Sequence, residues 1–195
     1  MTNKEHRCPP AFKKQPSHVQ QIKQNYFQLF KLSESFELDV STLAENYRQL
    51  QLAAHPDRFA AASETEKMRA VQLSSYLNEA YDTLKSTLRR AAYLLSLHDV
   101  DVEQVKQSDL GMDLLLEQIQ LREALDELPK DSSALPALEN LKAEVTVKLA
   151  NMERFFADEL QRREFVSAKK CFHEMQFIHK LLAEIDSSEE QRLGY

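Results

Sequence analysis

The segment that decides the fold of this chain spans residues 52–68 and reads LAAHPDRFAAASETEKM. Pro56 has a fixed φ and pushes the backbone of His55 out of the helical region, so a helix that reaches this point must end there. Ser63 and Glu66 have the spacing of a capping box, which predicts that a second helix begins just after Ser63. The segment is therefore predicted to be a short loop between two helices.

The sequence on both sides of this loop has the periodicity of amphipathic helices. The upstream helix is expected to begin with Asp39 or Ser41 as its N-cap, after an aromatic-rich helical turn at residues 25–32. A further apolar stretch at residues 91–97 continues the downstream helix or packs just after it. The apolar stripes consist of Leu43, Tyr47, Leu50 and Ala54 upstream, and of Leu73, Leu77, Ala80 or Tyr81, Leu84 and Leu88 downstream. Two such stripes joined by a short loop predict an antiparallel helical hairpin.

The C-terminal half contains three more amphipathic segments, at about residues 112–128, 136–160 and 162–186. Their connections are short, which favours antiparallel packing as a three-helix bundle. The chain contains only two glycines in 195 residues, so long stretches run without a helix breaker. The predicted fold class is all-α, organised as a flexible basic tail at 1–24, a hairpin domain at 25–97, a linker at 98–110 and a helical bundle at 111–195.

Charge and composition exclude several classes of partner. After residue 24 the chain has 20 basic and 30 acidic residues, so nucleic acid, whose phosphates are bound by clustered lysine and arginine, is not expected as a partner. No apolar run approaches the roughly 18 residues that a membrane span needs, so no membrane association is expected either.

Cys8 and Cys171 have neither metal-site spacing nor the pattern of a disulfide framework, which favours a reducing, cytoplasmic compartment. On the last predicted helix we expect Cys171 to be a core thiol and His173 to face solvent.

The tripeptide HPD at residues 55–57 lies between the two helices of the hairpin, and LNEAYDTL follows it at residues 77–84. This arrangement resembles the J-domain family of co-chaperones. Three more segments are similar to HscB, the J-protein of bacterial iron–sulfur cluster assembly: YFQLF at residues 26–30, RAAYLLSLH at residues 90–98 and LEQIQLRE at residues 116–123. The resemblance implies a co-chaperone that is not itself an enzyme and needs no cofactor. It also implies two protein partners, the DnaK-class chaperone ATPase HscA and the scaffold IscU, which HscB presents to HscA while stimulating ATP hydrolysis.

The resemblance assigns chaperone docking to His55, Pro56 and Asp57. Pro56 pre-organises the turn, and the carboxylate of Asp57 is suited to an arginine of the partner. Arg48 and Arg58 are the basic residues nearest the turn, so we expect them to contribute to docking. From the spacing alone, the tripeptide also fits a plain helix–helix turn, or a small helical enzyme that uses His55 and Asp57 as acid and base. No third group is in sight to orient such a pair.

A second candidate surface lies on the bundle, because the helix at 112–128 has apolar residues beyond the single stripe that packing needs. Its core stripe is predicted to be Leu114, Leu121, Leu125 and Leu128, and its surplus Met112, Leu115, Leu116 and Ile119. On the last helix Phe177 points away from the predicted core face, with Leu181 beside it one turn later. An exposed patch of this kind marks a protein interface, and its residues should be replaceable by alanine without loss of stability.

The resemblance implies that the matching region binds IscU, with client contacts at Leu115, Leu116, Ile119, Glu123 and Phe177. Two alternatives remain open at this point. These residues could instead pack between helices or against the hairpin domain. The chain could also be a J-protein with a different client, in which case we expect the patch to be buried.

Overall fold

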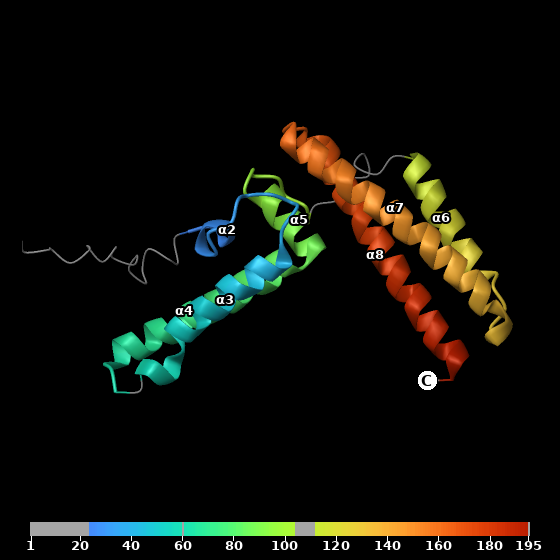
Figure 1. Cartoon of the computed structure of the whole chain (residues 1–195). Helices are drawn as coiled ribbons and strands as arrows, with labels where there is room; N and C mark the ends of the chain where they lie inside the picture. The colour runs from blue at the N-terminus through green and yellow to red at the C-terminus, as the bar shows by residue number, and fades with distance from the viewer. Residues whose placement is uncertain (1–23, 60, 104–111, 195) are drawn as a thin grey trace, which may run out of the picture. The chain divides into compact units, whose positions relative to one another are not determined.

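The computed structural model describes residues 24–59, 61–103 and 112–194, and its elements are helices throughout this part of the chain (Figure 1). The elements are α2 Tyr26–Leu29, α3 Val40–Ala54, the 3-10 helix η1 Pro56–Phe59, α4 Glu64–Lys85, α5 Thr87–Ser96, α6 Met112–Asp126, the 3-10 helix η3 Ser132–Ala134, α7 Leu135–Gln161 and α8 Phe165–Leu193. The prediction of an all-α fold is confirmed. Within the described ranges, no helix is both long enough and apolar enough to cross a membrane. The predicted basic tail, apart from residue 24, and most of the predicted linker lie outside these ranges, as does Cys8.

The ends of the hairpin helices follow the capping residues that the sequence indicates. Asp39 is the N-cap of α3, because its Oδ1 accepts a 2.9 Å hydrogen bond from the backbone N–H of Ser41. The helix ends at Ala54, two residues before the proline. At the start of α4, Glu66 Oε2 accepts a 3.0 Å bond from the N–H of Ser63, and Ser63 Oγ accepts a 3.4 Å bond from the N–H of Glu66, so the predicted capping box is confirmed. The loop expected after Pro56 is partly helical, because residues 56–59 form η1.

The inner faces of α3 and α4 are buried and the edge of the hairpin is aromatic. Tyr47 stacks on Tyr81 with ring centroids 4.2 Å apart, and its hydroxyl donates a 2.8 Å hydrogen bond to Asn78 Oδ1. These polar and aromatic contacts join α3 to α4 beside a core that includes the fully buried Leu43, Leu77 and Leu84. The buried core residues of α2, α3 and α4 are Phe27, Leu29, Leu43, Ala54, Ala70, Leu73, Leu77, Ala80 and Leu84.

The residue contacts group the chain into two compact units, and the boundary between these units crosses both α3 and α4. Within the described ranges, one unit comprises residues 24–33 and 44–81, and the other comprises residues 34–43 and 82–194. The open end of the hairpin and α5 therefore belong to the same compact unit as the bundle helices. The linker predicted at 98–110 does not coincide with this division and falls mostly outside the described residues.

The bundle consists of α6, α7 and α8, with α7 and α8 packed along one another (Figure 1). Arg163, with φ of 62°, interrupts the helix between them, and α8 ends at a left-handed Gly194 rather than near residue 186 as expected. The core prediction for α6 is confirmed at Leu125, which is buried with residues of α7 and α8. The cluster contains Leu125, Leu138, Val145, Ile178, Leu181 and Ile185, with Leu121, Leu128, Leu141, Leu149, Met152, Phe177 and Leu182 packed against it.

Candidate functional site

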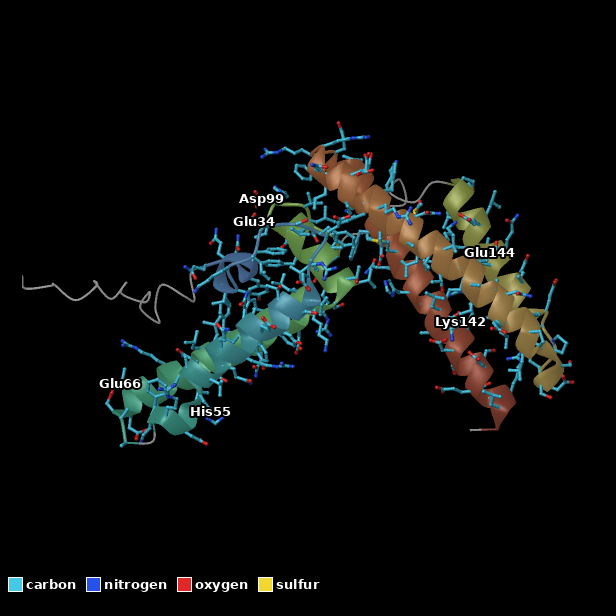
Figure 2. All side chains as sticks on the ribbon, viewed as in Figure 1. Glu34, His55, Glu66, Asp99, Lys142 and Glu144 are labelled. Carbon is cyan, nitrogen blue, oxygen red and sulfur yellow. The ribbon has the colours of Figure 1, made fainter. Side chains whose placement is uncertain are left out.

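The turn at the closed end of the hairpin is held by its own backbone. The N–H of Arg58 donates to the carbonyl of His55 at 3.0 Å, and the N–H of Asp57 donates to His55 Nδ1 at 3.3 Å. In the neutral ring this second bond leaves the hydrogen on Nε2, which can donate to another molecule. The side chains of His55 and Asp57 have exposed fractions of 53% and 90%. Figure 2 shows His55 and the α4 cap Glu66 at the same end of the hairpin.

The two predicted basic residues differ in their surroundings. Arg48 is exposed on α3, whereas Arg58 Nη1 donates a 3.1 Å hydrogen bond to the carbonyl of Leu52. That carbonyl lies in the last turn of α3, where no later residue of the helix can satisfy it. Arg58 therefore stabilises the end of α3 with one of its five donors. The side chain of Leu52 is 71% exposed and adds an apolar group that the sequence analysis did not select.

The outer face of α6 carries the predicted apolar surface. Leu116 and Ile119 are 51% and 53% exposed, and Met112 at the start of the helix is 70% exposed. Glu123 is exposed one turn after Ile119, and Leu115 is half-buried. Four of these five residues are therefore accessible on one helix, and the expectation that the face is free of packing holds for them but not fully for Leu115.

Phe177 is less exposed than the sequence indicates. Its ring is half-buried and packs against the bundle core. The guanidinium of Arg122 lies over the ring, with Cζ 5.7 Å from the centroid, and Arg122 Nη2 is 3.3 Å from Glu184 Oε1. Arg122 was not among the predicted site residues, although it comes one turn after Gln118 on the side of α6 that faces α8. The aromatic ring is thus part core and part surface.

Leu181 was expected beside Phe177 on this surface, and that expectation is wrong. Its side chain is fully buried in the core cluster. Since α8 contacts both α6 and α7, its buried face is wider than the single stripe that periodicity predicts. Of the predicted stripe on α6, Leu121, Leu125 and Leu128 pack as expected, while the side chain of Leu114 is outside the described set.

The thiol of Cys171 and the ring of His173 lie inside the fold. Burial raises the pKa of Cys171 to about 12, with the carboxylates of Glu174 and Glu159 adding to the effect, so the free thiol is protonated at neutral pH and is a poor nucleophile. His173 is 5% exposed, and the expectation that it faces solvent is wrong because α8 packs against α5 as well as α7. Among the described residues, no group of three histidine, cysteine or acidic side chains could hold a metal ion.

The sequence and fold have close counterparts among known proteins. Residues 110–186 match the family model described as the HSCB C-terminal oligomerisation domain. A co-chaperone protein HscB homolog of Aeromonas hydrophila is 39% identical over 166 residues, which cover 85% of this chain and 96% of that relative.

Solved structures agree with these sequence matches. The chaperone HscB from Vibrio cholerae superposes with a TM-score of 0.78 at 37% identity, covering 86% of this chain and 99% of the other. The crystal structure of human co-chaperone protein HscB superposes with a TM-score of 0.77 at 27% identity, covering 84% of this chain and 81% of the other. On this identity and coverage, the chain belongs to the HscB family of co-chaperones.

Proposed function

We propose that this protein delivers the scaffold IscU to the DnaK-class chaperone HscA in the cytoplasm and stimulates ATP hydrolysis by HscA, which promotes transfer of the iron–sulfur cluster. The protein binds both partners and performs no catalysis of its own. The proposal rests on membership of the co-chaperone family together with two accessible surfaces of different chemistry, one on the hairpin turn and one on α6 and α8.

The turn is the observation that carries the chaperone half of the proposal. The carboxylate of Asp57 is 90% exposed, so it can accept charge-assisted hydrogen bonds from an arginine of HscA. The backbone bond to His55 Nδ1 orients the ring and leaves Nε2 as a donor. Because the backbone of the turn is held by its own hydrogen bonds, docking requires little ordering of the turn. Arg48 supplies positive charge on the neighbouring helix face.

The apolar face of α6 supports the client half. Leu116 and Ile119 are the exposed anchors on α6, and Phe177 on α8 adds the accessible part of a ring that Arg122 of α6 covers. Buried apolar and aromatic side chains ringed by polar groups carry most of the free energy at protein interfaces. Glu123 supplies such a polar group one turn after Ile119, and the half-buried Leu115 adds further apolar area on the same helix.

Steady-state ATP turnover by HscA, with and without IscU, tests the chaperone half. The wild-type protein should raise turnover, and His55→Gln should return it to the rate of HscA alone while melting at the wild-type temperature, since the side chain is exposed. His98→Gln makes the same exchange at another exposed histidine and should stimulate normally. Full stimulation by His55→Gln would contradict the assignment of the turn.

Calorimetric titration with purified IscU tests the client half separately. The proposal expects binding that does not depend on His55, because the turn and the α6 face are different surfaces. If the protein stimulates HscA but fails to bind IscU, it is a J-domain co-chaperone with a different client.

A further inference from the structure

Two apolar side chains on the outer side of α4 are exposed to solvent. Met68 and Val71 are 64% and 55% exposed, and because they are three residues apart they are neighbours on the surface of the helix. Neither belongs to the buried stripe of α4 or to the two binding surfaces described above. Single exposed apolar residues are common on protein surfaces, so the pair gains meaning only from what lies next to it.

The first described residues of the chain are fastened to the same helix. The hydroxyl of Tyr76 on α4 donates a 2.7 Å hydrogen bond to the carbonyl of Gln24. The hydroxyl of Tyr26 donates a 2.9 Å bond to Glu79 Oε1, and its ring packs edge-on against that of Tyr76 with centroids 5.4 Å apart. Residues 1–23 therefore join the described chain at the side of α4.

An exposed stripe on α4 leads from this anchor to the apolar pair. A helix turns about 100° per residue, so positions separated by four, three and four residues stay within about 60° of one another. The exposed residues at this spacing are Met68, Gln72, Ser75 and Glu79. Val71 lies about 60° to one side of Met68 on the helix surface. The stripe therefore begins at the hydrogen-bonded Glu79 and ends at an apolar surface.

The stripe runs toward the turn that carries His55. Met68 lies in the second turn of α4, and Figure 2 shows His55 and Glu66 at this end of the hairpin. The helix rises by about 12 Å from Met68 to Tyr76, whereas an extended chain spans up to about 3.3 Å per residue. About four residues before Gln24 are therefore enough to reach the apolar pair.

The sequence before Gln24 has apolar residues at this distance. Val19 and Ile22 stand among polar residues in the sequence SHVQQIK at residues 17–23. Their spacing of three residues equals that of Met68 and Val71. A segment that follows the stripe toward the turn therefore brings one apolar pair over the other.

The charges upstream favour the same direction. Two carboxylates at the turn end of the hairpin are highly exposed, Asp57 at 90% and Glu64 at 89%. Glu64 pairs with Lys67, so Asp57 is the better partner for a further cation. Lys13 and Lys14 precede the apolar residues of the segment and would come to lie near the turn. Exposed pairs of this kind add a modest attraction.

We propose that residues 1–23 dock along the exposed stripe of α4, with Val19 and Ile22 covering Met68 and Val71, and that the docked segment hinders HscA from reaching the turn. The effect on HscA rests on the proposed function, whereas the docking itself does not. The contact extends the one already made by the residues that follow the segment, and all of these residues belong to one compact unit.

The tether makes a weak contact sufficient. A segment attached beside its own binding surface is present at a roughly millimolar effective concentration. HscA then meets a turn that is accessible only while the segment is released, and its apparent affinity falls by that fraction.

Nitrogen-15 relaxation of the full chain tests the docking without HscA. The amides of residues 19–23 should have order parameters above about 0.6, the level below which a backbone is flexible. Met68→Ala combined with Val71→Ala should lower them below about 0.6 and leave the thermal melt unchanged, because both side chains are exposed. Leu52→Ala, at a 71% exposed residue of α3, is the matched control and should keep the segment ordered.

Affinity for HscA tests the hindrance with a change in the segment alone. Val19→Ser combined with Ile22→Ser should release the segment and leave α4 untouched. If the segment is docked for about nine-tenths of the time, its release should tighten HscA binding about tenfold. Gln20→Ser combined with Gln21→Ser changes the polar neighbours and should bind HscA like the wild type.

Each contrary result points to a different occupant of the stripe. Order parameters below about 0.6 in the wild type would overturn the inference. Order that appears only as the protein concentration is raised would assign the stripe to a second copy of the chain, and order that appears only with HscA would assign it to the chaperone; both overturn the inference. Weaker HscA binding by the Val19 and Ile22 variant would also overturn it, because the segment would then assist docking. A wild-type protein with an ordered segment that fails to bind HscA would overturn the proposed function and leave the docking in place.

Discussion

The hairpin turn and the α6–α8 surface differ in what holds their functional side chains. At the turn, His55 and Asp57 project into solvent from a backbone fixed by the hydrogen bonds of the turn itself. On the bundle, exposure decreases from Leu116, which is half exposed, to Phe177, whose ring packs on the core. At the turn, the side chains proposed to bind a partner therefore contribute little to stability. On the bundle surface, some of the side chains proposed to bind the client also contribute to stability.

This difference determines which substitutions report on binding alone. A side chain that touches only solvent can be replaced with little change in the free energy of unfolding. A side chain that fills part of a core cannot, because its removal leaves a cavity. On the client surface, only substitutions at the exposed end of α6 should separate affinity from stability.

The largest effect is expected for Leu116→Ala combined with Ile119→Ala. Central apolar anchors each contribute about 2 kcal/mol or more at an interface, so losing both should cost about 4 kcal/mol and weaken IscU binding about a thousandfold. Titration calorimetry measures the affinity, and a thermal melt should give nearly the wild-type midpoint. Val147→Ala, which removes an exposed apolar side chain from α7, is the matched control and should bind IscU normally.

If the double variant melts well below the wild type, these two side chains are core and the comparison between the turn and the bundle fails. Unchanged affinity with an unchanged melt would mean that the client binds elsewhere.

The next largest effect distinguishes Leu181 from Phe177, its neighbour one turn earlier on α8. Leu181→Ala should destabilise the bundle by about 2–5 kcal/mol, because the side chain is fully buried. Phe177→Ala should cost less stability and should also weaken client binding, since only part of its ring is in the core. Urea unfolding gives the two free energies. Replacing Leu115, Ile119 and Phe177 together, which periodicity suggested would spare the fold, is now expected to lower stability. Equal costs for Leu181 and Phe177 would show that the ring is not partly surface.

The sequence predicts the hairpin well because its determinants are local. Proline at position 56, the N-cap Asp39 and the capping box from Ser63 to Glu66 each act within a few residues, so the helix ends follow from the chain itself. The same locality explains why the exposure of His55 and Asp57 could be anticipated.

Burial on α8 could not be predicted to the same degree, because it depends on how many neighbours the helix has. A single helix face predicts one stripe, but α8 meets α5, α6 and α7 and buries Leu181 and His173 outside that stripe. The position of Arg122 over Phe177 also depends on residues far apart in the chain, which no local pattern contains.

A smaller effect is expected when Arg48 and Arg58 are replaced by alanine together. Each exposed charge contributes about 1 kcal/mol or less, so docking on HscA should weaken by about tenfold and depend less on salt. The loss of the Arg58 bond to the Leu52 carbonyl should also fray the end of α3 slightly. Affinity for HscA measured at low and high salt checks this. Binding that is unchanged at low salt would place the electrostatic contacts on other residues and leave the turn as the whole docking site.

The smallest effect concerns acid stability near the turn, and it tests whether local bonds hold this region. Hydrogen bonds from the Ser63 hydroxyl and then from its N–H lower the pKa of Glu66 below the usual range. A carboxylate whose pKa is lower in the folded state stabilises it fully above the unfolded pKa of about 4.3, and the contribution is lost as pH falls through the folded pKa. Glu66→Gln retains an acceptor for the capping box but carries no charge, so it should be slightly less stable than the wild type at pH 7, and the two stabilities should converge as pH falls below about 4.3. Urea unfolding at several pH values measures this slope, with Glu45→Gln on the exposed face of α3 as the matched control. Coincident stability profiles for wild type and Glu66→Gln across the whole pH range would mean that the charge of Glu66 adds nothing to the capping box.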